Sequence, residues 1–202
     1  LQVVDECGQK GVRGLVVITA GFKEIGGAGK EHERKLLELV RRYDMRMVGP
    51  NCLGIIDTTT KLNASFAALM PNPGQIAFMS QSGALCTAIL DWSKSEGIGF
   101  SRFVSLGNKA DVDEVALLEA WGGDPQNRVI LAYLEGISNG TAFIKTARAV
   151  TKHTPVIAIK SGTTQAGTRA ISSHTGSLAG SEKAYEAAFA QSGILRCNGS
   201  AR

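Results

Sequence analysis

From residue 75 onward, short apolar segments alternate with segments of helical periodicity, and this alternation constrains the fold more than any other feature. The apolar segments are rich in β-branched and aromatic residues and too short for helices, so they predict strands. They lie at residues 75–79, 101–106, 129–134 and 156–160, with a candidate fifth at 194–196. The helical segments lie at about residues 85–92, 112–121, 143–150 and 181–191. Right-handed crossovers place such helices over both faces of a parallel sheet, which predicts an α/β, flavodoxin-like domain over residues 75–202.

The first 57 residues show the same alternation on a smaller scale. A strand is predicted at 14–20, a helix at about 31–43 and a strand at 45–48. These elements make only about half of a doubly wound, Rossmann-like domain, so we expect its missing strands to precede this segment in a longer parent protein. Residues 58–74 contain consecutive threonines followed by Pro71 and Pro73, which favours a linker. The predicted organisation is a partial domain (1–57), a linker (58–74) and the flavodoxin-like domain (75–202).

Composition excludes several classes of function. The net charge of +4 is spread along the chain, and the basic residues of 30–46 alternate with acidic ones, so no nucleic-acid partner is expected. No apolar run approaches the roughly 20 residues of a membrane-spanning helix, and the first residues do not have the layout of a signal peptide. We therefore expect a cytoplasmic protein without a membrane partner. The four scattered cysteines predict reduced thiols and no metal site.

One candidate site follows the strand at 75–79, where the chain reads Ser80-Gln81-Ser82-Gly83 and enters a helix. Carboxyl ends of parallel strands are where open sheets bind ligands. The free N–H groups of a first helical turn bind anions, aided by the helix dipole. The simpler alternative is that Ser80 or Ser82 is only an N-cap.

Two further candidates follow other strands. Residues 161–180 are rich in Gly, Ser and Thr, have no helix or strand pattern, and contain His174. Long irregular stretches inside a domain are often functional, although His174 could also be an ordinary exposed side chain. Glu135 ends an apolar strand at the same predicted sheet edge. It is either a plain strand terminator or the partner that fixes the tautomer of a histidine.

Five motifs extend this pattern along nearly the whole chain: Thr19–Glu24, Val48–Gly54, Ser80–Gly83, Gly107–Asp113 and Ser173–Gly176. In this order they resemble the NDP-forming acyl-CoA synthetases, namely the α subunit of succinyl-CoA synthetase and, more closely, the α portion of ADP-forming acetyl-CoA synthetases. The first two motifs look like the second half of the CoA-binding domain of that family. The combination is highly specific, whereas each motif alone is weak.

The resemblance implies a role for each candidate residue. His174 would be phosphorylated, and Glu135 would hydrogen-bond its ring. Asn51 would lie near the thiol end of CoA and the acyl group. The phosphoryl oxygens would accept hydrogen bonds from the N–H groups of Ser82, Gly83 and Ala84.

The resemblance also implies a reaction and its partners. Acyl-CoA, phosphate and ADP would be interconverted with a small carboxylic acid, CoA and ATP, through an acyl phosphate and phosphohistidine. The Gly/Ser/Thr-rich segment would carry the histidine to ATP or ADP bound with Mg²⁺ on an ATP-grasp subunit or domain. That module is not found in this sequence, so this chain is expected to be part of a larger, oligomeric enzyme. The sequence does not identify the acid.

Two other functions are compatible with parts of the pattern. Ser82, Asp111 or Asp113, and His174 follow the nucleophile, acid, base order of α/β-hydrolases. However, Ser80 and Ala84 replace the two glycines of the G-x-S-x-G turn. The second alternative is a ligand-sensing, synthetase-like module fused to an acetyltransferase. The reactive histidine is typically lost in such modules, and the presence of His174 argues against this one.

Overall fold

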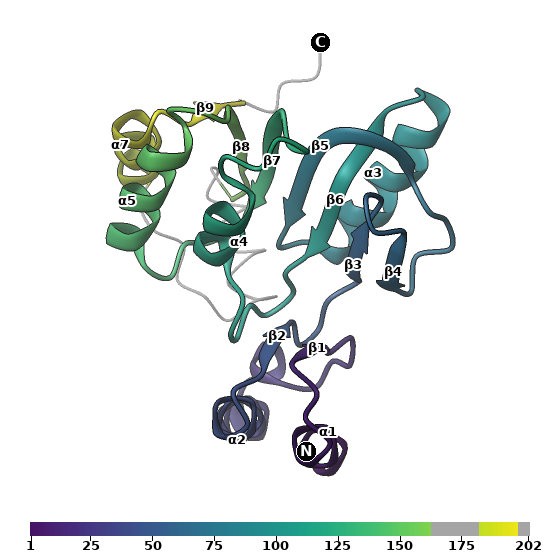
Figure 1. Cartoon of the computed structure of the whole chain (residues 1–202). Helices are drawn as coiled ribbons and strands as arrows, with labels where there is room; N and C mark the ends of the chain where they lie inside the picture. The colour runs from purple at the N-terminus through teal and green to yellow at the C-terminus, as the bar shows by residue number, and fades with distance from the viewer. Residues whose placement is uncertain (163–181, 198–202) are drawn as a thin grey trace.

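The computed structural model describes residues 1–162 and 182–197. The larger part is built on a seven-stranded sheet in the order β4-β3-β6-β5-β7-β8-β9 (Figure 1). Its strands are β3 (Gly54–Asp57), β4 (Leu62–Ser65), β5 (Asn72–Ser80), β6 (Gly99–Ser105), β7 (Val129–Leu134), β8 (Val156–Lys160) and β9 (Leu195–Arg196). Its helices are α3 (Gly83–Ser95), α4 (Glu114–Trp121), α5 (Gly140–Val150) and α7 (Glu182–Ser192).

The strands from β5 to β9 pair in parallel in the order β6-β5-β7-β8-β9. This is the flavodoxin-like order, and it confirms the predicted fold class. The chain leaves β5 for one neighbour, β6, and later returns to the other side of β5 as β7. The crossovers therefore diverge between β5 and β7. This switch point opens a crevice at the carboxyl ends of these two strands.

Helices cover both faces of the sheet, as the alternation predicts. On one face α3 packs Cys86 and Leu90 against aromatic strand residues, including Phe78 and Phe103. On the opposite face α4, α5 and α7 form the larger core with β5, β7 and β8 (Figure 1). Burial of these apolar side chains is the main source of stability of such a domain.

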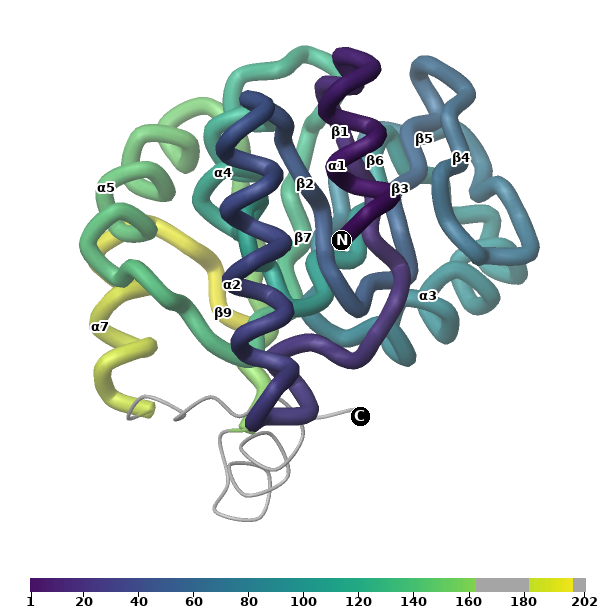
Figure 2. The backbone as a smooth tube through the Cα atoms, turned by 90° about the horizontal axis from the view of Figure 1, so that it is seen from below, coloured from purple at the N-terminus to yellow at the C-terminus, as the bar shows by residue number. Residues whose placement is uncertain are grey.

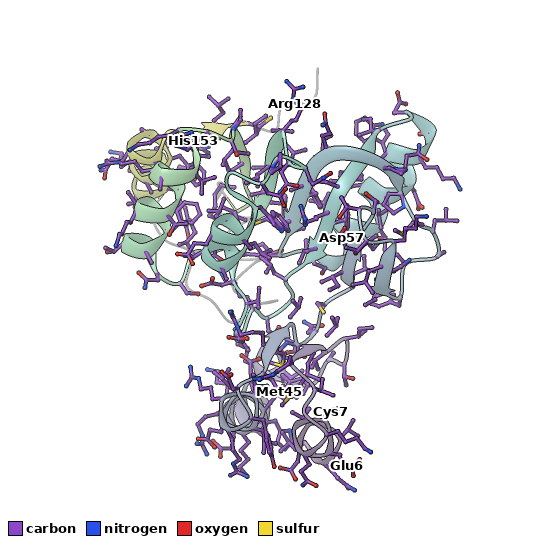
Figure 3. All side chains as sticks on the ribbon, in the orientation of Figure 1. Glu6, Cys7, Met45, Asp57, Arg128 and His153 are labelled. Atoms are coloured by element: carbon purple, nitrogen blue, oxygen red, sulfur yellow. The ribbon has the colours of Figure 1, made fainter. Side chains whose placement is uncertain are left out.

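The smaller part consists of α1 (Gln2–Gln9), β1 (Gly14–Val16), the 3₁₀ turn η1 (Lys23–Ile25), α2 (Gly27–Arg42) and β2 (Arg46–Val48). β1 and β2 pair in parallel, and α2 buries Leu36 and Val40 against Met45 and Met47. Cys7 of α1 packs against the same cluster, and Figure 3 labels Cys7 and Met45 in this smaller part. The strand predicted at 14–20 ends at Val16, because its partner β2 ends at Val48. Beyond it, Val17 N–H donates to the Val48 carbonyl and Asn51 N–H to the Thr19 carbonyl.

Residues 58–74, predicted as a linker, contain β4 and the first residues of β5. β3 pairs antiparallel with both β4 and β6, so this hairpin extends the large sheet. The Asp57 carboxylate accepts hydrogen bonds from the N–H groups of Thr59 and Thr60 at 2.8 and 3.0 Å and closes the hairpin turn. The threonines that suggested a linker therefore form a turn between two strands. The division of the chain into domains stays a prediction.

None of the helices in the described part of the chain has both the length and the hydrophobicity that a membrane crossing requires. The carboxyl ends of β5, β6 and β7 face the smaller part, so the loops after these strands lie between the two parts (Figure 1). Seen from below, α1, α2 and β2 lie across this edge of the sheet (Figure 2).

Candidate functional site

A cavity of about 300 Å³ lies at the switch point between β5 and β7. Among its lining residues are five that the sequence predicted for the site: Asn51, Ser82, Gly83, Ala84 and Glu135. A second cavity of about 270 Å³ adjoins the first. The two cavities share the lining residues Gln81, Gly107, Asn108 and Glu135. The structure thus brings together residues that are up to 84 positions apart in the sequence, from Asn51 to Glu135.

The start of α3 supplies hydrogen-bond donors to the first cavity. The first intrahelical bond runs from Cys86 N–H to the Ser82 carbonyl, so the preceding N–H groups have no partner within the helix. Leu85 N–H donates to Ser82 Oγ at 3.3 Å, which makes Ser82 the N-cap. Gly83 and Ala84 line the cavity, and their N–H groups have no hydrogen-bond partner within residues 1–162 and 182–197. A Cβ atom at Gly83 would meet no protein atom within 4 Å, so packing does not require glycine there.

Ser82 differs in one respect from its predicted role. Its N–H donates to Ser80 Oγ at 3.0 Å, and the Ser80 hydroxyl donates to the Ser82 carbonyl at 3.0 Å. Ser80 is fully buried and holds the turn in this shape. Of the three predicted N–H donors, the structure leaves those of Gly83 and Ala84 for a ligand, while Ser82 offers its hydroxyl group.

Glu135 follows β7, and the backbone of its turn is held by Gln81. The Gln81 Oε1 atom accepts hydrogen bonds from the N–H groups of Glu135 and Gly136, both at 2.9 Å. The Gln81 Nε2 atom donates to the Gly136 carbonyl at 2.9 Å. One side chain therefore links the turn that precedes α3 to the turn that carries Glu135.

A buried ion pair lies beside this contact. Lys109 Nζ is 2.8 Å from Oε2 of Glu114, and the Glu114 side chain is fully buried. Lys109 also donates to the Gly136 carbonyl at 2.5 Å, and Gln81 Nε2 lies 3.3 Å from the same Glu114 oxygen. Lys109 and Gln81 thus share two acceptors, one on the Glu135 turn and one on α4.

Asn51 reaches the cavity from the smaller part. It has a left-handed backbone with φ of 57°, a conformation that asparagine tolerates better than most residues. Its Nδ2 atom donates to Oδ1 of Asn108 at 3.3 Å. The buried Asn108 in turn donates to Glu24 at 2.6 Å and to Glu33 at 2.8 Å. Burial raises the pKa of Glu24, but the hydrogen bonds from Asn108, Gly21 and Phe22 outweigh it, so the net pKa is lowered.

A lysine and a tyrosine, Lys160 and Tyr185, are buried together near Glu135. Lys160, the last residue of β8, places Nζ 4.6 Å from the centre of the Tyr185 ring. Burial lowers the pKa of Lys160, while the negative charges of Glu182 and Glu135 act in the opposite direction. The Tyr185 hydroxyl accepts a hydrogen bond from Ile137 N–H at 3.2 Å, and burial raises its pKa.

His174 lies outside the described residues. The chain before it leaves β8 at Lys160, and Ser161 N–H donates to the Leu134 carbonyl at 3.0 Å. Since Leu134 directly precedes Glu135, the segment that contains His174 starts beside the Glu135 turn.

The two aspartates of the hydrolase alternative have structural partners. Asp111 accepts hydrogen bonds from Met47 N–H at 2.7 Å and Arg46 Nε at 3.0 Å. Asp113 caps α4 by accepting from Ala116 N–H at 3.0 Å. Each carboxylate is thus engaged away from Ser82, which weakens the case for a hydrolase triad.

Sequence reasoning assigned no individual role to five residues of this site, although the first four lie in motifs that carry the resemblance: Glu24, Gln81, Asn108, Lys109 and Phe66. A usable signal existed for three of them. Gln81, Asn108 and Lys109 are polar residues within three positions of the ends of predicted strands, at the edge where an open sheet binds ligands. Phe66 gave no such signal, because its place in the cavity depends on the hairpin of β3 and β4.

Fold and cavity together define a flavodoxin-like α/β domain whose switch point is lined by the start of a helix and by an acidic residue. Comparison with known proteins gives the family. Residues 73–201 match the family described as the succinyl-CoA ligase like flavodoxin domain, and the chain belongs to this family. The predicted resemblance to NDP-forming acyl-CoA synthetases is confirmed.

Individual relatives are ADP-forming ligases. The chain is 51% identical over 197 residues to acetate–CoA ligase [ADP-forming] I of Archaeoglobus fulgidus, covering 98% of this chain and 29% of that protein. It is also 51% identical to the acetate–CoA ligase [ADP-forming] II subunit alpha of Pyrococcus furiosus, covering 98% of this chain and 43% of that subunit. The chain therefore spans less than half the length of these relatives.

A solved structure shares the fold. It is the dinucleotide forming acetyl-coenzyme A synthetase 1 of Ca. Korarchaeum cryptofilum in complex with phosphate and ADP. The TM-score is 0.93 at 47% identity, and the match covers 98% of this chain and 42% of that one.

Proposed function

We propose that this chain is the part of an ADP-forming acyl-CoA synthetase that binds the acyl and phosphoryl groups and carries the phosphohistidine. The enzyme interconverts acyl-CoA, phosphate and ADP with a carboxylic acid, CoA and ATP. One observation carries the proposal: Gly83 and Ala84, in the first turn of α3, line one cavity at the switch point together with Glu135. The segment that contains His174 starts beside it.

The proposed chemistry uses each group for one task. Phosphate oxygens accept hydrogen bonds from Gly83 and Ala84 N–H, supported by the positive end of the α3 dipole. Phosphate displaces CoA from the acyl group near Asn51 and gives an acyl phosphate. A ring nitrogen of His174 then attacks the phosphorus atom and releases the acid as a carboxylate. Glu135 accepts the N–H of the other ring nitrogen and stabilises the positive charge of the ring.

The remaining reactants need parts beyond this chain. We propose that an ATP-grasp domain or subunit binds ADP or ATP with Mg²⁺ and exchanges the phosphoryl group with His174, in an oligomeric, cytoplasmic enzyme. The names of the relatives, which include acetate and 4-hydroxybutyrate ligases, favour a small carboxylic acid. The chain matches 43% or less of these ligases, which supports a multi-part enzyme.

The test uses the full-length parent enzyme with γ-labelled ATP and Mg²⁺. We expect an acid-labile, base-stable label that His174→Asn abolishes. His153→Asn is the matched control, because His153 is exposed at the end of α5, and it should label like the wild type. Undiminished label in His174→Asn would overturn the proposal. Absence of label in the wild type, with CoA still bound, would favour the ligand-sensing module instead, and a fluorophosphonate probe on Ser82 would favour the hydrolase.

A further inference from the structure

Gln81 links the two turns of the proposed site. It is the first residue after β5, and its N–H still donates to the Tyr133 carbonyl at 3.1 Å, which continues the pairing of β5 with β7. It directly precedes Ser82, the N-cap of α3. Its backbone therefore belongs to the anion-binding turn, while its side chain contacts the Glu135 turn.

The side chain uses its amide on the backbone of that turn. Oε1 accepts from two successive N–H groups, those of Glu135 and Gly136, and Nε2 donates to the Gly136 carbonyl, all at 2.9 Å. A single rotamer thus makes three hydrogen bonds to two residues. The Gln81 side chain is partly buried, so a displacement that breaks these bonds leaves donors or acceptors with restricted access to water.

The turn is also held from α4. Lys109 donates to the same Gly136 carbonyl as Gln81 does, and both side chains contact Oε2 of the buried Glu114. This ion pair leaves Gln81 little freedom to move without losing bonds to a buried carboxylate. Side-chain hydrogen bonds therefore tie the Glu135 turn to the start of α3, in addition to the backbone pairing of β5 with β7.

We propose that Gln81 is a positioning residue that fixes Glu135 relative to the N–H groups of Gly83 and Ala84. This inference rests on the proposed function, in which Glu135 orients His174 while the helix start binds the phosphoryl oxygens. Phosphoryl transfer depends on the alignment of the attacking nitrogen with the phosphorus atom. Displacing Glu135 by about 1 Å would lower the rate of transfer by about 10- to 100-fold without weakening nucleotide binding.

The test is a double-mutant cycle in the full-length enzyme, with His174 phosphorylation by ATP as the rate measured. Gln81→Met keeps the length of the side chain and removes its three bonds to the Glu135 turn. Glu135→Gln removes the carboxylate. If Gln81 acts through Glu135, each single variant slows phosphorylation by about 10- to 100-fold, KM for ATP stays the same, and adding Gln81→Met to Glu135→Gln causes no further loss.

A matched control separates positioning from stability. Asn127 is a buried amide that bonds Ser101 and the Trp121 carbonyl, and it precedes β7 at the opposite end of that strand. Asn127→Leu should lower the unfolding temperature and leave the phosphorylation rate unchanged. Gln81→Glu provides a second variant: it retains an acceptor for the two N–H groups but faces the Gly136 carbonyl and Glu114 with another acceptor. We expect Gln81→Glu to slow phosphorylation in the wild-type background. Added to Glu135→Gln, it should again cause no further loss of rate.

The outcomes distinguish the inference from the function it rests on. If Gln81→Met and Glu135→Gln slow phosphorylation multiplicatively, Gln81 acts independently of Glu135 and the inference is wrong, while phosphorylation of His174 stands. If Gln81→Met has the wild-type rate, the inference is equally overturned. If the label does not depend on His174, the proposed function itself fails.

Discussion

At the scale of single residues, Gly107 shows how backbone geometry shapes the site. Its φ of +56° is in the left-handed region, and a Cβ atom there would lie 2.3 Å from the Pro50 carbonyl oxygen. This close approach lets Asn108 N–H donate to the Pro50 carbonyl at 2.8 Å. The glycine therefore permits the loop after β6 to contact the segment that carries Asn51.

Gly107→Ala should be more destabilising than a glycine substitution that strains the backbone alone. The matched control is Gly123→Ala, where φ is +78° but a Cβ atom meets nothing within 4 Å. We expect a loss of about 1–2 kcal/mol in the free energy of unfolding for Gly123→Ala, and a loss of about 3 kcal/mol or more for Gly107→Ala, because its Cβ collides with backbone atoms. Urea unfolding measures both. Equal losses in the two variants would show that the loop containing Gly107 shifts to accommodate the added Cβ atom without a further loss of stability.

The cysteines should react according to burial. Burial raises the pKa of Cys52 to about 11 and that of Cys86 to about 12, whereas Cys197 is exposed. At pH 8 only about one Cys52 side chain in a thousand would be a thiolate, the reactive form. We expect iodoacetamide to alkylate Cys197 first, and Cys52 and Cys86 only after unfolding. Peptide mass spectrometry over time tests this order, and Cys52 alkylation as fast as that of Cys197 would contradict it.

At the scale of elements, helix starts combine stability with function. In the described part of the chain, side chains cap α3 (Ser82), α4 (Asp113) and α5 (Asn139). Of these three helix starts, that of α3 lines the cavity at the switch point. The same local arrangement is therefore structural in two helices and part of the candidate site in the third.

Two substitutions should separate the structural role of a helix start from its functional role. One should lower stability alone, and the other should lower the phosphorylation rate alone. Asn139→Ala removes the bond from Ala142 N–H and should cost about 1 kcal/mol, with no change in the rate of His174 phosphorylation. Gly83→Ala should leave stability unchanged or raise it by about 0.5–1 kcal/mol, because its Cβ meets open space. It should nevertheless slow phosphorylation, since the methyl group enters the cavity. A wild-type rate in Gly83→Ala would argue against phosphate at this turn.

At the scale of the whole molecule, one loop joins the two parts. The N–H groups of Asn108, Ala110 and Val112 donate to the carbonyls of Pro50, Gly49 and Met47 at 2.8–3.0 Å. The Asn108 side chain adds bonds to Glu24 and Glu33. The candidate site lies where this loop crosses between the parts, so their relative position determines its shape.

Acid should weaken this contact through Glu24. Its pKa in the folded protein is lowered from the ordinary 4.5, so the ionised carboxylate stabilises the fold above that value, and this contribution is lost as the pH falls through the lowered pKa. We expect the difference in unfolding free energy between wild type and Glu24→Gln to be largest at pH 6–7 and to shrink below about pH 4. Urea unfolding across this range provides the measurement. A constant difference would exclude a role for the charge of Glu24.

Much of the large sheet was predictable, because most of its strands have a recognisable local pattern of short apolar segments. Predicted and observed bounds agree at 129–134 and 156–160, where short runs rich in β-branched and aromatic residues have one face buried and the other only partly buried. The hairpin of β3 and β4 was not predictable in the same way. Its pairing partner β6 lies more than 40 residues further along the chain, and short polar strands such as Leu62–Ser65 carry no periodic signal.

For the candidate site, the sequence alone determined which polar groups stand at strand ends: Ser82 after one strand, Glu135 after another, and Asn108 after a third. It also determined the fold class, since an alternation of strands and helices has few compact solutions. Only the tertiary structure determined the hydrogen-bond partners of these groups. It engages the Ser82 N–H with Ser80 and brings the Gln81 side chain to the Glu135 turn. The reason is physical: periodicity reports burial within one element, whereas a hydrogen bond between turns depends on the order and register of strands far apart in the chain.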